Sequence, residues 1–172
     1  MIKGNGFVLR PIKMSDAERY LECYQGKNMK QCMLKFPETL TEAKEELKKK
    51  VSDFRKKRPF GQTFAIEVKG IFAGYIEIHH LNIEHHEHKG EIGYAIHPDF
   101  RGQGLATKAV KVLTKYAFEK HSLKRIDAWG RANNKASARV LEKVGYKLEG
   151  VLRKNKCVDG KYLDDFVYAK VR

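Results

Sequence analysis

The chain is poor in cysteine, proline and tryptophan, and it lacks any long apolar run. Its 172 residues include 3 Cys, 4 Pro and 1 Trp. Cys23, Cys32 and Cys157 form no Cys-x-x-Cys pair, which excludes a disulfide-stapled protein and indicates reduced thiols in the cytoplasm. No segment approaches the about 20 apolar residues that span a bilayer, and the N-terminus lacks the apolar stretch of a secretory signal. We expect a soluble cytoplasmic protein without membrane contacts, folded as one domain over residues 1–172.

Acidic residues are too few to balance the basic ones. The chain has 21 Asp plus Glu against 35 Lys plus Arg, a formal net charge of +14. Such an excess attracts anions, and RNA, anionic lipid and phosphorylated cofactors all qualify. A lysine-rich solvated surface has the same composition. Charge therefore selects no function on its own.

Apolar periodicity predicts a mixture of strands and helices. Helices are expected after two capping boxes, Ser15 with Glu18 and Thr39 with Glu42, and again over 105–116 and 134–145. Strands are expected over 7–11, 64–68, 72–79, 91–96, 125–130, 148–153 and 163–170. The order predicts the α/β (α+β) class, with one parallel crossover inside a mostly antiparallel sheet.

A glycine-rich loop separates the strand at 91–96 from the helix that follows it. Gly102 and Gly104 allow backbone N–H groups to turn toward an anion at the helix N-terminus, and Arg101 adds a cation. The chain has no Walker sequence, and Thr107 stands where a Rossmann fingerprint needs its third glycine or alanine. The loop predicts a phosphate site of another kind, although an ordinary tight turn has similar residues.

Two motifs resemble the GNAT superfamily of N-acetyltransferases, in particular the branch that acetylates the N-termini of ribosomal proteins. The first runs from Glu91 through Arg101 to Thr107, and the second from Asn134 through Ser137 to Gly145 and Tyr146. The chain end, 149–153 and 160–168, is similar to that branch as well. The resemblance spans about residues 7–168. It implies a GNAT-like domain with about seven strands, splayed at the fourth and fifth, and about four helices.

The resemblance also implies acetyl-CoA as cosubstrate and no metal. The splayed strand would hold the pantetheine arm, with Ile96 polarising the thioester carbonyl, and Asn134 and Ser137 would contact the cofactor. Such preorganised donors contribute about 3 to 4 kcal/mol each in acyl transfer. The loop expected to wrap the pyrophosphate consists of Arg101, Gly102, Gln103, Gly104, Leu105, Ala106 and Thr107.

The implied reaction is direct attack of an amine on acetyl-CoA, which needs a base for the amine and an acid for the leaving thiolate. Many family members use a Tyr as acid where this chain has Leu141. The branch implies Ser137 instead, although Ser137 also suits a helix cap beside Asn134. Lys156 replaces the branch's Glu base. The candidate bases are Glu91 first, then Glu77 and His79, each of which can equally be an ordinary strand-end polar group.

Five of the seven histidines lie within ten residues. They are His79, His80, His85, His86 and His88. The stretch is predicted to be a loop without the i, i+4 spacing of helical ligand pairs, so we expect no functional metal site there. Adventitious nickel or zinc binding is compatible with the same composition.

Three functions remain open at this point. The first is acetylation of a protein N-terminus, such as that of a ribosomal protein, with RNA contacts through the basic surface. The second is acetylation of a polyamine or aminoglycoside, for which only a small acidic group is available: Glu84, Glu87, Asp164 and Asp165. The third is a catalytically silent RNA-associated protein on the same fold. The sequence allows a monomer or a homodimer.

Overall fold

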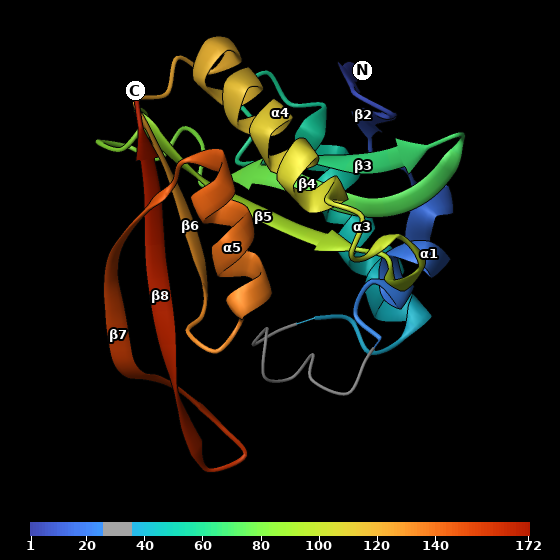
Figure 1. Cartoon of the computed structure of the whole chain (residues 1–172). Helices are drawn as coiled ribbons and strands as arrows, with labels where there is room; N and C mark the ends of the chain where they lie inside the picture. The colour runs from blue at the N-terminus through green and yellow to red at the C-terminus, as the bar shows by residue number, and fades with distance from the viewer. Residues whose placement is uncertain (26–35) are drawn as a thin grey trace.

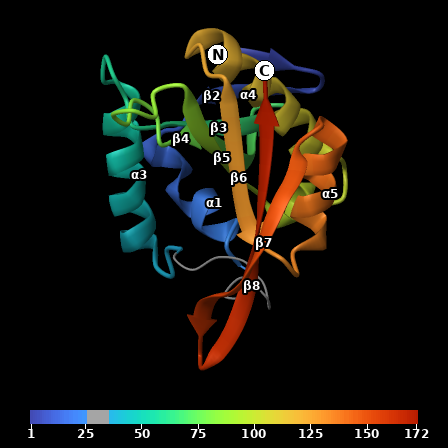
Figure 2. The ribbon, with the colours of Figure 1, turned by 90° about the vertical axis from the view of Figure 1, so that its left-hand side faces the viewer.

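One mixed sheet separates two layers of helices in a computed structural model, which describes residues 1–25 and 36–172 (Figures 1 and 2). Within these residues the sheet has eight strands in the order β1-β2-β3-β4-β5-β6-β8-β7. The strands are β1 Ile2–Gly4, β2 Phe7–Pro11, β3 Gln62–Val68, β4 Ile71–His79, β5 Lys89–Ile96, β6 Arg125–Arg131, β7 Lys147–Val158 and β8 Lys161–Val171. The α-helices in the described part are α1 Ala17–Glu22, α3 Leu40–Phe54, α4 Leu105–Lys120 and α5 Lys135–Val144, as expected in number.

Alternation along the strands divides the core between the two helical layers. On β4, Ile76 and Ile78 are fully buried in the cluster that includes the apolar residues of α4 and α5. Tyr75 faces the other way, into the cluster formed with α1 and α3. Figure 2 shows α1 and α3 on one side of the sheet and α4 and α5 on the other. Because successive side chains of a strand point to opposite faces, neighbouring residues of one strand serve different layers.

Helix ends test the capping predictions directly. At α3, Thr39 and Glu42 form the expected capping box, with Glu42 N–H donating to Thr39 Oγ1 over 3.2 Å. The predicted Ser15–Glu18 box is wrong. The Asp16 carboxylate, held by Arg10, accepts from the Lys13 N–H over 2.8 Å. The chain therefore enters a short 3-10 turn at Met14–Asp16, and α1 begins at Ala17 without a side-chain cap.

The predicted splay is confirmed. It lies between β5 and β6 instead of between the fourth and fifth strands, because the short strand β1 adds one strand before them. Strand β5 pairs with β4 as far as Ile96. On its other side it pairs in parallel with β6 only over Lys89, Gly90 and Glu91. In the described part of the chain, residues 92–96 of β5 thus have one edge without a strand partner. The backbone groups along this edge can receive an extended ligand, apart from the Ile96 carbonyl, which accepts from Arg101 Nε.

Two further expectations concern membranes and thiols. None of the helices in residues 1–25 and 36–172 is long and apolar enough to cross a membrane. Cys23 is a buried free thiol and Cys157 an exposed one. Cys32 lies outside the described residues.

Candidate active site

Side chains from both helical layers meet at consecutive residues of the splayed strand. Tyr94 points toward α5, where its hydroxyl lies 2.8 Å from Ser137 Oγ. Gly93 lies on the opposite face, directly across from Glu77 in the β4–β5 register. A Cβ added at Gly93 would meet Glu77 Oε1 at 3.3 Å. A carboxylate and a pair of hydroxyl groups therefore lie on opposite faces of the sheet, at the part of β5 that has no β6 partner.

The hydroxyl pair is fixed by the start of α5. Asn134 caps this helix, and its Oδ1 accepts from the Ser137 N–H over 3.1 Å, as the sequence predicted. Burial raises the pKa of Tyr94 to about 12, although its hydrogen bond with Ser137 acts in the opposite direction. Tyr94 is therefore a neutral phenol at physiological pH. Leu141, where the family resemblance led us to look for a tyrosine, is buried in the core with 1% exposure and offers no proton.

The carboxylate of Glu77 is anchored through one oxygen. Its Oε2 accepts from Lys50 Nζ of α3 over 2.5 Å and from Thr63 Oγ1 of β3 over 2.8 Å. Burial raises the pKa of Glu77, but the positive charge of Lys50, the electrostatic influence of His79 and the hydrogen bonds from Lys50 and Thr63 together outweigh burial, so the net effect is a pKa below the ordinary value. The group is thus an anion at neutral pH. Its Oε1 is the oxygen that lies against Gly93.

Glu91 and His79 lie farther along, where β5 and β6 are still paired. His80 Nδ1 is 3.0 Å from Glu91 Oε2, and His79 Nε2 is 3.8 Å from Glu91 Oε1. Burial lowers the pKa of His79, so the ring is neutral. Ligand atoms of these three residues lie within 4.8 Å of one another, a spacing that a divalent cation can use. Because His80 and Glu91 already satisfy one another, we assign no metal to the group.

The loop before α4 has the conformation that an anion requires. Gly102 and Gly104 have φ values of +76° and +71°, and no atom lies within 4 Å of a Cβ added at either position. Gly104 is the N-cap of the 16-residue α4 and provides no side-chain cap. The amides of Leu105, Ala106 and Thr107 in the first turn therefore lack a cap, at the positive end of the helix dipole. This arrangement fits the pyrophosphate of a CoA ester.

Arg101 ties this loop to the rest of the site. Its Nε donates to the Ile96 carbonyl over 2.9 Å, and a terminal nitrogen donates to the Cys23 carbonyl over 3.0 Å. Gln103 Nε2 donates to the Asp99 carbonyl over 3.2 Å. Arg101 thus links the end of β5, the residue after α1 and the start of the loop, in addition to the positive charge that the sequence predicted there.

Three contributing residues escaped the sequence analysis. Tyr94 and Lys50 contact Ser137 and Glu77 across separations of 43 and 27 residues, which no local pattern reveals. His97 is 4% exposed, and its Nε2 lies 2.6 Å from Glu22 Oε2 while its Nδ1 lies 3.2 Å from Arg19. The sequence signal for its role was its place between the apolar strand that ends at Ile96 and the proline at position 98. His97 fixes α1 to the end of β5.

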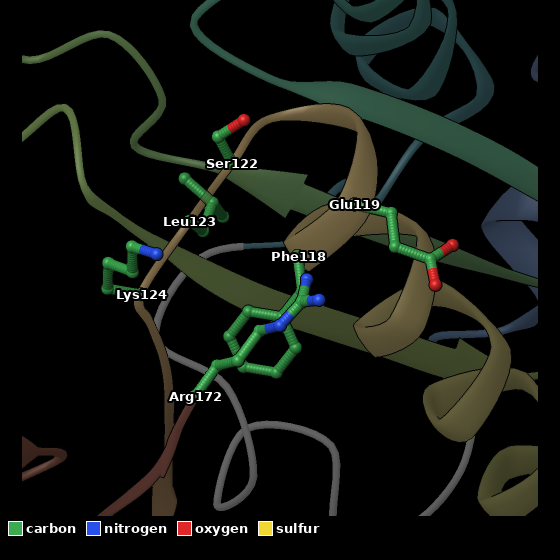
Figure 3. A pocket seen from close by; sticks show the side chains of 6 residues that line it. All are labelled: Phe118, Glu119, Ser122, Leu123, Lys124 and Arg172. Atoms are coloured by element: carbon green, nitrogen blue, oxygen red, sulfur yellow. The ribbon is translucent and has the colours of Figure 1, made fainter.

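A surface pocket at the far end of α4 is separate from this site (Figure 3). It is lined by Phe118, Glu119, Ser122, Leu123, Lys124 and Arg172. All of them except the C-terminal Arg172 belong to the last turn of α4 or follow it directly, whereas the glycine loop precedes the first turn. A helix of this length spans about 24 Å, so the pocket cannot share a ligand group with the loop.

Comparisons with known proteins agree with the geometry. The family model described as "Acetyltransferase (GNAT) domain" matches residues 7–147 of this chain. The putative ribosomal N-acetyltransferase YdaF of Bacillus subtilis is 30% identical, over 95% of this chain and 90% of its own. The spermidine N(1)-acetyltransferase of Escherichia coli is 25% identical, over 90% and 80% of the two chains. A GNAT-family acetyltransferase structure from Bacillus anthracis superposes with a TM-score of 0.85 at 25% identity, covering 99% and 97%.

The chain belongs to the GNAT acetyltransferase family. It is an acetyl-CoA-dependent N-acetyltransferase, as the two motifs predicted. The ribosomal and spermidine enzymes among its relatives share this chemistry and differ in the amine that they acetylate.

Proposed function

We propose that this enzyme, acting as one domain over residues 1–172, transfers the acetyl group of acetyl-CoA to the N-terminal α-amine of a protein, namely a ribosomal protein in the cytoplasm. One observation carries the proposal. Glu77 of β4 lies against Gly93 on one face of the sheet, and the Tyr94–Ser137 pair lies on the other face. Positions 93 and 94 are adjacent in the part of β5 that has no β6 partner. A thioester lying along that edge meets an anionic base on one side and hydroxyl groups on the other.

The cofactor residues follow from this orientation. Arg101, Gly102, Gln103 and Gly104, with the first-turn residues Leu105, Ala106 and Thr107, hold the pyrophosphate. The pantetheine arm then runs along β5 past Ile96, with Asn134 and Ser137 on the α5 side. Strands advance about 3.3 Å per residue, so two residues of strand separate Ile96 from Tyr94 by about 7 Å. The arm reaches its sulfur beside the Tyr94–Ser137 pair.

Glu77 is the base that this geometry favours among the three candidates. The incoming ammonium transfers a proton to Glu77 Oε1, and the neutral amine attacks the thioester carbon. The C–N bond forms and the C–S bond breaks, and the sulfur keeps the electron pair. Glu91 is bonded to His80 and stands where β6 still closes the strand edge. We assign Glu91 and His79 to the wall that receives the acceptor amine.

The acceptor is argued from charge and from the relatives. A polyamine needs a free acidic groove, but Asp165 is paired with Arg131 over 2.8 Å, with both side chains buried. Asp164 accepts from the Lys154 N–H over 2.7 Å. Two of the four candidate acidic groups are thus engaged within the protein. The similarity to a putative ribosomal N-acetyltransferase and the net charge of +14 support an acceptor presented by the ribosome.

The experiment is competition between acceptors for labelled acetyl-CoA. Purified enzyme is incubated with isotopically labelled acetyl-CoA, ribosomal proteins with free N-termini, spermidine and an aminoglycoside, and products are identified by mass spectrometry. We expect label on ribosomal-protein α-amines. Label confined to spermidine or the aminoglycoside would show that the acceptor is a small-molecule amine and not a protein N-terminus. Absence of label in every fraction, with acetyl-CoA binding intact, would favour the catalytically silent RNA-associated alternative.

A further inference from the structure

We propose that Tyr94 is the positioning residue for Ser137, donating a hydrogen bond to Ser137 Oγ so that the serine proton points at the sulfur of the departing CoA. The inference rests on the proposed function and deepens it. Tyr94 occupies the splayed strand, and Ser137 the first turn of α5. The Tyr94 hydroxyl lies 2.8 Å from Ser137 Oγ and 3.4 Å from the Ser137 carbonyl.

The direction of this hydrogen bond follows from what each hydroxyl can accept. A serine hydroxyl rotates freely, so a lone Ser137 would distribute its proton among several directions. The Tyr94 hydroxyl has one proton, and of its two possible acceptors Ser137 Oγ at 2.8 Å is nearer than the Ser137 carbonyl at 3.4 Å. A phenol is also more acidic than an aliphatic alcohol, so Tyr94 is the better donor of the pair. When Tyr94 donates to Ser137 Oγ, the O–H bond of the serine must point away from Tyr94. The direction that remains toward the strand edge is the one a sulfur would occupy.

Protonation supports the same assignment. Burial raises the pKa of Tyr94 to about 12, so the phenol retains its proton throughout the physiological range. Tyr94 is therefore a permanent donor and a poor proton source. Leu141 leaves no phenol at the position from which many relatives protonate the thiolate. Tyr94 brings a phenol to this region from the strand instead of the helix.

The chemistry balances without proton transfer from either hydroxyl. As the C–S bond breaks, the sulfur takes the electron pair and develops negative charge. Ser137 donates a hydrogen bond to that charge, and Tyr94 strengthens it because a hydroxyl that accepts a hydrogen bond donates a stronger one. The nitrogen of the tetrahedral intermediate loses its remaining extra proton to water. CoA leaves as the thiolate.

The test is a double-mutant cycle in single-turnover acetylation at saturating acetyl-CoA, with Tyr94→Phe, Ser137→Ala and the double variant. We expect Tyr94→Phe to reduce the rate about tenfold, with the acetyl-CoA KM within about twofold of wild type. In the Ser137→Ala background the same change should have almost no further effect. A structural role for the Tyr94 hydroxyl would persist without Ser137, so additive losses would overturn the proposal, as would wild-type rates for Tyr94→Phe.

The matched control is Tyr116→Phe. This change removes another partly buried hydroxyl, which donates to Gln62 Oε1 over 3.2 Å and lies outside the site. We expect its rate to match that of wild type. A loss equal to that of Tyr94→Phe would show that removal of a tyrosine hydroxyl lowers the rate for general structural reasons.

A binding measurement separates this inference from the proposed acceptor. Calorimetry compares CoA with desulfo-CoA at a pH of about 9, above the ordinary thiol pKa of about 8.5. We expect wild type to prefer CoA several-fold, and Tyr94→Phe and Ser137→Ala to lose that preference. The result needs no acceptor. Equal preference in all three proteins would contradict the inference even if the proposed function holds, and a lost preference would support it even if ribosomal proteins are not acetylated.

Discussion

A single lysine keeps Glu77 ionised within the sheet. Lys50 Nζ lies 2.5 Å from Glu77 Oε2, and the two side chains are 18% and 15% exposed. The other ionisable groups around Glu77 are Glu46 of α3, also paired with Lys50 over 3.3 Å, and His79 of β4. Burial opposes the ionisation of Glu77, whereas Lys50, His79 and the hydrogen bond from Thr63 favour it. The charge of Lys50 is the largest of the causes that lower the pKa of Glu77.

We therefore predict a pH effect for Lys50→Met. Without Lys50 the pKa of Glu77 rises, so the acid limb of the kcat/KM profile moves to higher pH. The variant should also be less stable. In the wild type, the lowered pKa of Glu77 stabilises the fold above the unfolded-state pKa of about 4.3, and this stabilisation disappears as pH falls through the folded-state pKa. Breaking the pair should cost about 3 kcal/mol at neutral pH. Pre-steady-state rates and urea unfolding test both effects.

Exposed Lys49 provides the control for that experiment. Lys49→Met removes the same charge from the same helix without touching Glu77. Its pH profile should coincide with that of wild type. An equal shift in both variants would indicate a general field effect and would remove the specific role of Lys50.

Gly93 leaves space beside Glu77, the base that we propose. A Cβ there would meet Glu77 Oε1 at 3.3 Å and His79 Nε2 at 3.7 Å. We predict that Gly93→Ala displaces the Glu77 carboxylate by a few tenths of an ångström and reduces kcat/KM for the acceptor about tenfold. The melting temperature should change little, because the atoms nearest to the added Cβ belong to the side chains of Glu77 and His79 and not to the backbone. Steady-state kinetics and calorimetry on the same sample measure both.

Gly90→Ala is the opposite case on the same strand. Its added Cβ would meet Ile78 Cδ1 at 3.1 Å and Leu81 and Leu123 at 3.2 Å, all within the core. Overpacking should cost about 1–3 kcal/mol of stability and leave the kinetics nearly unchanged. If Gly90→Ala lost activity and Gly93→Ala lost only stability, the placement of the acceptor side would be wrong.

At the scale of elements, our proposal places the pyrophosphate of acetyl-CoA at the N-terminus of α4 and its glycine loop. Gly104 has a φ of +71° and open space where a Cβ would stand, so Gly104→Ala introduces conformational strain without a clash. Relief of that strain turns the first-turn amides away from the pyrophosphate. We predict an acetyl-CoA Kd about tenfold weaker, measured by calorimetry.

Gly6→Ala tests whether strain alone explains such a result. Gly6 has a φ of +83°, also with nothing within 4 Å of an added Cβ, and it lies in the turn between β1 and β2. Both variants should lose about 1 kcal/mol of stability. Acetyl-CoA affinity should fall in Gly104→Ala alone, and a matching fall in Gly6→Ala would contradict a local role for the loop.

Elements with strong local signals were predictable from the sequence, whereas contacts between them were not. The glycine loop and the Asn134 cap depend on residues close together in the chain, and both were correctly predicted as structure. The Ser15–Glu18 box was wrong because Asp16, oriented by Arg10, competed for the same turn. The three-residue strand β1 is too short for a periodic pattern.

The site shows the same division. Ser137 was a candidate because of the resemblance to the ribosomal branch, and Glu77 because of its residue type and its place on the preceding strand. Their partners Tyr94 and Lys50 come from other elements. Only the folded sheet places Gly93 opposite Glu77 and leaves residues 92–96 without a β6 partner. The choice of Glu77 over Glu91 therefore required the strand register.

At the scale of the whole molecule, the net charge of +14 predicts salt-sensitive association with ribosomes. Cosedimentation with ribosomes should weaken steeply between low and physiological salt. Acetylation of a short neutral peptide carrying the same N-terminal sequence should change little over that range, because it depends on the site alone. Salt-independent cosedimentation would argue against a docking role for the basic surface.

The central claim is that Glu77 accepts the proton of the amine while hydroxyl groups on the other face of β5 receive the sulfur. Its most direct measurement is the single-turnover rate of Glu77→Gln at saturating acetyl-CoA, beside exposed Glu119→Gln as control. We predict a loss of about 100-fold or more for Glu77→Gln, with the acetyl-CoA Kd unchanged and Glu119→Gln equal to wild type. A Glu77→Gln rate within about threefold of wild type would contradict the account and return the base assignment to Glu91 or His79.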